Sequence, residues 1–105
     1  MKLIRSKVPA IAASKGERLH TRHAGPEERW TLLKAKLVEE ALELQATPPA
    51  SEAEIEEMAD VIEVVRRLCD DLELSEPGRL EAAYAKKLDE RGELGFTVLL
   101  DEDER

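Results

Sequence analysis

The sequence is poor in aromatic residues and in cysteine, and it contains no asparagine. Its 105 residues include one Trp, one Tyr and one Phe, so the core must be small and built from aliphatic side chains. The single cysteine, Cys69, excludes an intrachain disulfide and a zinc site made of several thiolates. No apolar run approaches the roughly 18 residues of a membrane-spanning helix. No secretory signal is recognisable either, so we expect a cytoplasmic protein without membrane contacts.

Positive charge is also scarce relative to negative charge. The formal net charge is −8, which argues against general nucleic-acid binding through a basic surface. Charged residues make up 38% of the chain, and Ala, Glu, Lys, Leu and Arg dominate it. This composition is typical of a helical protein. If such an acidic chain handles phosphates, it needs a bound metal or a local basic patch.

Two long helices are predicted on either side of a break at Thr47–Ala50. The first runs from Pro26 to about Ala46, and two prolines in the break end it. Ser51 then offers an N-cap for the second helix, and Glu54 completes a capping box there. Apolar residues recur at three- and four-residue steps in both. These residues are Trp30, Leu33, Leu37, Ala41 and Leu44 in the first helix, and Ile55, Met58, Ile62, Val65, Cys69 and Leu72 in the second.

Shorter elements are predicted toward both ends of the chain. Val8–Ala13 fits a short helix with a proline in its first turn. A third helix covers Leu80–Leu88, and Gly92 is suited to end it. Phe96–Leu100 is β-prone and could pair with Lys2–Arg5, because a lone strand cannot satisfy its backbone.

These elements predict one all-α domain over residues 1–105. We expect an antiparallel helical bundle of two long helices and a third, with short terminal β-strands as an option. Residues 1–25 form an N-terminal arm, and residues 101–105 form an acidic tail. Val61 and Leu68 widen the apolar face of the second long helix beyond what one neighbour can cover. We therefore expect a homo-oligomer.

Four carboxylates stand out by their spacing. Glu40 and Glu43 form one pair three residues apart, and Glu57 and Asp60 form another. At about 100° per residue, each pair lies along the margin of an apolar face. Glu43 and Glu57 are each seven residues from position 50, and Glu40 and Asp60 are each ten residues from it. A hairpin folded at that position brings all four together.

Carboxylates this close repel one another, and burial increases the cost. Mg²⁺ or Mn²⁺ would compensate, because carboxylate and water oxygens suit these hard cations. Lys36 together with raised pKa values is the alternative. A third interpretation is that the acidic pairs are ordinary solvated faces, since pairs of this kind are common on helices.

The same residues resemble the MazG-like all-α nucleoside triphosphate pyrophosphohydrolase superfamily. Its EExxE and ExxD pattern matches EEALE at residues 39–43 and EMAD at residues 57–60, with Lys36 preceding them. The opening KLIRSKVP at residues 2–9 is similar to the KLVRDKIP of a small MazG-like subfamily. KKLDERG at residues 86–92, followed by Phe96, resembles the C-terminal RGGF region of that subfamily.

The resemblance implies metal-dependent cleavage of a nucleoside triphosphate into a monophosphate and pyrophosphate. The substrates would include non-canonical nucleotides that such an enzyme removes. The resemblance also implies a homodimer or homotetramer. It assigns Mg²⁺ or Mn²⁺ binding to Glu40, Glu43, Glu57 and Asp60. Glu39 would orient or activate the attacking water, and Lys36 would offset charge or touch phosphate. The candidate phosphate contacts are Arg5, Lys7, Lys87 and Arg91.

Two other functions stay open from the sequence. One is a phosphoribosyl-ATP pyrophosphohydrolase of histidine biosynthesis, which has a similar helical motif but not this opening. The other is a helical interaction module without enzymatic activity. The sequence also departs from the subfamily, because Ser6 replaces the aspartate of its opening motif. The missing asparagine argues against the dUTPase-like branch, which often has one shortly after the ExxD aspartate.

Overall fold

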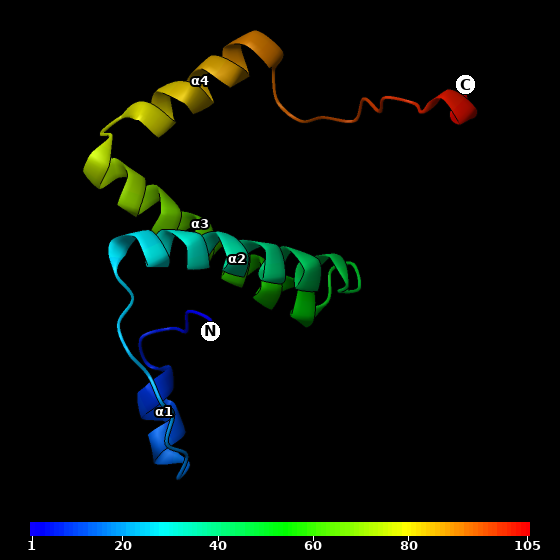
Figure 1. Ribbon diagram of the computed structural model, residues 1–105. Helices are drawn as coiled ribbons and strands as arrows, with labels where there is room; N and C mark the ends of the chain where they lie inside the picture. The colour runs from blue at the N-terminus through cyan, green and yellow to red at the C-terminus, as the bar shows by residue number, and fades with distance from the viewer. The chain divides into compact units, whose positions relative to one another are not determined.

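Helices form where the sequence places apolar residues at helical spacing, and the computed structural model describes all 105 residues. The chain is all-helical, which confirms the predicted fold class (Figure 1). No helix is both long enough and apolar enough to cross a membrane. The elements are α1 (Val8–Ser14), α2 (Pro26–Gln45), α3 (Glu52–Ser75), α4 (Arg79–Arg91) and a short 3-10 helix, η1 (Glu102–Glu104).

The chain divides into two compact units, residues 1–71 and residues 72–105. The sequence predicted a single domain, and the boundary between the units falls near the end of α3. The first unit contains α1, α2 and most of α3, together with every buried residue of the chain. It therefore contains the core.

The connection between α2 and α3 is a tight, hydrogen-bonded turn. Ala50 takes a left-handed conformation with φ 59°, which costs an L-residue roughly 1–2 kcal/mol. Its backbone N–H donates to Glu54 Oε1 at 2.8 Å, and the Glu54 N–H donates to Ser51 Oγ at 3.1 Å. Ser51 caps α3 as predicted. In a capping box, the Glu54 side chain would accept a hydrogen bond from the backbone N–H of Ser51. Here it accepts from the backbone N–H of Ala50, one residue earlier.

The two long helices lie side by side and antiparallel (Figure 1). The buried apolar residues are Leu33 on α2, Val64 on α3 and Ala12 on α1. Arg29 Nε donates to Asp71 Oδ2 at 2.9 Å at the open end of the hairpin. These two residues are each 21 positions from residue 50. The hairpin therefore keeps the expected register along its whole length.

The second unit contains α4 and the C-terminal segment. α4 begins after Gly78 and ends before Gly92, and both glycines have positive φ angles. No strand forms in this chain, so the optional terminal strands over Phe96–Leu100 and Lys2–Arg5 are absent. Phe96 is fully exposed, and Val98 and the leucines around it are largely so. Without apolar burial, nothing offsets the entropy that ordering a strand would cost.

Candidate metal centre

Three of the four predicted carboxylates meet at the middle of the hairpin. Glu40 projects from α2, and Glu57 and Asp60 project from α3, where they are three residues apart. One carboxylate oxygen from each lies within 4.8 Å of the other two. The register about position 50 produces this convergence, because it sets the α2 and α3 residues at matching levels. At this spacing, one cation could reach an oxygen of each residue.

Glu40 is the most buried member of the cluster. It is the one buried charged residue of the chain, with 5% of its surface exposed. Its Oε1 lies 3.2 Å from Lys36 Nζ, but its Oε2 is buried and has no hydrogen-bond partner. Glu57 Oε2 is also buried without a partner. Burying a carboxylate oxygen without a donor is costly, and a divalent cation would satisfy both oxygens.

Proton sharing partly relieves the repulsion between Glu40 and Glu57. The nearby Glu40 carboxylate, which would accept a hydrogen bond from a protonated Glu57, raises the pKa of Glu57 to about 7 together with burial. Burial alone would raise the pKa of Glu40, but a shared proton from Glu57 and the Lys36 ammonium outweigh it and lower that pKa. The pair therefore takes up a proton as the pH falls through neutrality, and Glu40 keeps the negative charge. A metal ion binding there would displace that proton.

Glu43 is the predicted ligand that the structure leaves outside the close group. It is exposed and lies one turn further along α2, nearer the Thr47–Ala50 turn. Its charge still acts on the cluster, because it contributes to the raised pKa of Glu57. Glu43 is therefore placed at the rim of the cluster.

Lys36 and Glu39 lie beside the cluster on α2. Lys36 Nζ is 3.2 Å from Glu40 Oε1 and 3.6 Å from Glu39 Oε1. Burial opposes the charge on Lys36, but both glutamates favour it, and the net effect raises the lysine pKa. A cavity of about 80 Å³ adjoins both residues and is also lined by Met1 and Lys2. Lys2 is a cation near the site that the sequence did not single out.

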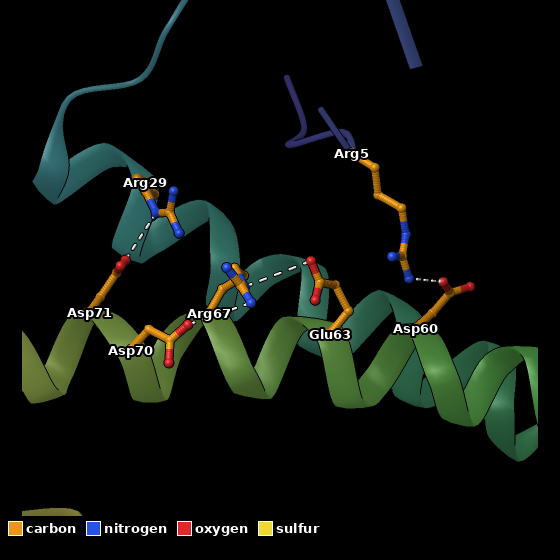
Figure 2. A network of polar contacts seen from close by, with 7 residues as sticks. All are labelled: Arg5, Arg29, Asp60, Glu63, Arg67, Asp70 and Asp71. Carbon is orange, nitrogen blue, oxygen red and sulfur yellow. Dashed lines mark hydrogen bonds and ion pairs between the residues drawn. The ribbon is translucent and has the colours of Figure 1, made fainter. Parts of the chain in front are cut away.

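Arg5 contacts the cluster directly, in a way that the sequence did not predict. Its Nη2 donates to Asp60 Oδ1 at 2.7 Å, as Figure 2 shows. Arg5 was expected at a phosphate, and here it pairs with a predicted metal ligand. Residue 5 precedes α1 and residue 60 lies on α3, so no helical spacing relates them. The only signal for Arg5 was the resemblance of KLIRSKVP, which assigned it to a phosphate.

The other expected phosphate contacts lie on other segments of the chain. Lys7 is exposed and precedes α1 as its N-terminal flanking residue. Lys87 and Arg91 are exposed residues of α4, in the second unit.

A comparison with protein-family models finds no match to this chain, and comparisons with curated proteins and with solved structures find none either.

Proposed function

We propose that this protein is a Mg²⁺- or Mn²⁺-dependent nucleotide pyrophosphohydrolase. The observation that carries the proposal is the buried, unpartnered carboxylate oxygen of Glu40 beside Glu57 and Asp60. Hard divalent cations prefer such a set of oxygens. Cations of this kind assist phosphoryl chemistry by neutralising phosphate charge and lowering the pKa of bound water. The EExxE and ExxD resemblance supplies the substrate class, a nucleoside triphosphate.

Each residue near the cluster has a role in this proposal. Glu40, Glu57 and Asp60 hold the cation, and Glu43 contributes a further oxygen from the rim. Lys36 balances the charge of Glu40, which its ammonium contacts at 3.2 Å. Glu39 orients the attacking water and accepts its proton, since this carboxylate is half-buried at the edge of the cluster. The water oxygen bonds to the α-phosphorus as the α–β anhydride bond breaks, which forms the monophosphate and releases pyrophosphate. Positioning does most of the catalytic work in such transfers.

The test is pyrophosphate release from a panel of canonical and modified nucleoside triphosphates. We expect turnover with Mg²⁺ or Mn²⁺ that falls below detection when EDTA removes the cation. Phosphoribosyl-ATP belongs in the panel, because activity on it alone would favour the histidine-biosynthesis alternative. Folded protein that releases no pyrophosphate from any substrate with either cation would contradict the proposal.

We further propose that the protein assembles as a homodimer or homotetramer through α3. Ile55, Met58, Ile62 and Val65 form an exposed apolar stripe on this helix, and each is 39–57% exposed. At about 100° per residue, the stripe lies on a different face from Val64, which is buried. Contiguous apolar patches of this kind mark interaction sites. A second copy suits it, because a two-fold axis matches one apolar stripe to another without opposing charges.

Analytical ultracentrifugation at micromolar concentration tests this interface. We expect the natural chain to sediment as an oligomer and Ile62→Glu to sediment as a monomer, because the charge would be buried in the interface. Leu74→Glu is the matched control, since Leu74 is 86% exposed and lies off the stripe. A monomeric natural chain, or equal dissociation by both substitutions, would contradict the assembly.

A further inference from the structure

The N-terminal arm places a cation on the acidic cluster. Arg5 lies before α1, in a stretch without helix or strand. Its guanidinium contacts Asp60 Oδ1 at 2.7 Å, and the arginine and aspartate side chains are 55% and 37% exposed. Figure 2 shows Arg5 reaching α3 from outside the hairpin. The pair is therefore accessible to solvent and to ions.

The charge around Arg5 comes from several carboxylates. The hydrogen bond to Asp60 is the main reason that the pKa of Arg5 is raised, and the charges of Glu63 and Glu40 add to it. Glu63 is engaged by Arg67, whose Nε lies 3.7 Å from Glu63 Oε2. Arg5 thus balances mainly the charge of Asp60. The same carboxylate lies within 4.8 Å of the oxygens of Glu40 and Glu57.

We infer that Arg5 and a divalent cation compete for Asp60, and that metal binding releases Arg5 to hold a substrate phosphate. The inference rests on the metal centre of the proposed function. A divalent ion at Glu40, Glu57 and Asp60 neutralises the charge that holds the guanidinium, so the two cations disfavour each other. Released Arg5 remains beside the metal, and its planar fork suits phosphate oxygens.

Calorimetric titration of Mg²⁺, without nucleotide, tests the competition. Arg5→Gln should bind Mg²⁺ about two- to five-fold more tightly than the natural chain, as expected from losing one exposed ion pair that competes for a ligand. Tighter Mg²⁺ binding by Arg5→Gln would indicate that the arginine competes with the cation. If Arg5 instead served to orient Asp60 for the metal, the same substitution would weaken binding by about 10-fold or more. Weakened or unchanged affinity overturns the inference.

Arg22→Gln is the matched control. Arg22 forms an ion pair of the same 2.7 Å length with Glu28, so the substitution makes the same change in charge. Glu28 and Glu40 are 12 residues apart on α2, which is about 18 Å along the helix axis. Screening over about 10 Å at 0.1 M salt leaves little influence at the cluster. We expect its Mg²⁺ affinity to equal that of the natural chain.

The release of Arg5 is tested with inorganic pyrophosphate in saturating Mg²⁺. Arg5→Gln should bind this probe more weakly, by about 10-fold, because a charged hydrogen-bonding partner is lost. Equal pyrophosphate affinity would overturn the phosphate role.

Mg²⁺ binding by Glu40→Gln distinguishes failure of the metal centre from failure of the competition between Arg5 and the cation. If this substitution leaves Mg²⁺ affinity unchanged, the metal centre and the proposed function fall together. If it abolishes Mg²⁺ binding while Arg5→Gln has no effect, only the competition is wrong.

Discussion

Glu40→Gln is expected to weaken Mg²⁺ binding by at least about 100-fold and to abolish pyrophosphate release. The substitution keeps the shape of the side chain but removes the one buried negative charge of the chain. Loss of an outer partner of a metal ligand already costs 10- to 100-fold, and Glu40 is a proposed ligand itself. Calorimetry for Mg²⁺ and a pyrophosphate-release assay measure the two effects.

Glu56→Gln provides the control for this prediction. Glu56 is exposed on α3, next to Glu57 in the chain but outside the group that could hold a metal. Like Glu40→Gln, the Glu56→Gln substitution replaces one carboxylate with one amide. We expect its Mg²⁺ affinity and turnover to stay within about two-fold of the natural chain, as for a screened surface charge. If both substitutions weaken Mg²⁺ binding equally, the cation is held diffusely and the metal centre is wrong.

Glu57→Gln is expected to raise the melting temperature of EDTA-treated protein at pH 8 and to leave it nearly unchanged at pH 4.5. The pKa of Glu57 is about 7 in the folded chain, against an ordinary value of 4.5. A raised carboxyl pKa stabilises the fold below the ordinary pKa, and this contribution is lost as the pH rises through the folded value. Glutamine mimics the protonated carboxyl, since its amide can donate to Glu40 at every pH. Thermal melts across pH 4.5–8 would show the difference.

The same variant should lose Mg²⁺ affinity, because an amide cannot replace the carboxylate charge. Stability and metal binding therefore change in opposite directions at pH 8. Glu56→Gln again serves as the control, and its melting temperature should show no such dependence on pH. A Glu57→Gln variant that is less stable than the natural chain at pH 8 would mean that Glu57 is ionised and stabilising there.

Much of the hairpin could be predicted from local rules. Proline and glycine positions predicted where α2 and α4 end, and counting residues from position 50 predicted that Glu40 meets the α3 carboxylates. The Arg29–Asp71 ion pair obeys the same count. These features follow from helix geometry and from a short connection, which the sequence displays directly.

Other features could not be predicted, because helical spacing does not relate separate elements. The spacing showed that α3 is apolar on a wide face, but not which part packs within the chain. Val64 is buried there, whereas Ile62 is 49% exposed. The pairing of Arg5 with Asp60 depends on the position of the N-terminal arm relative to α3. The terminal strands did not form, because β-propensity alone does not provide a partner.

The turn at Ala50 has a consequence for how relatives of this protein can be recognised. One residue inserted between Ser51 and Glu57 would rotate Glu57 and Asp60 by about 100° and shift them by about 1.5 Å relative to the cap. The insertion would leave every acidic residue and the ExxD pattern intact while moving both side chains away from Glu40. A homologous site is therefore identified by the distance of its carboxylates from the turn, and a chain with the same acidic motifs at another distance would lack this carboxylate cluster.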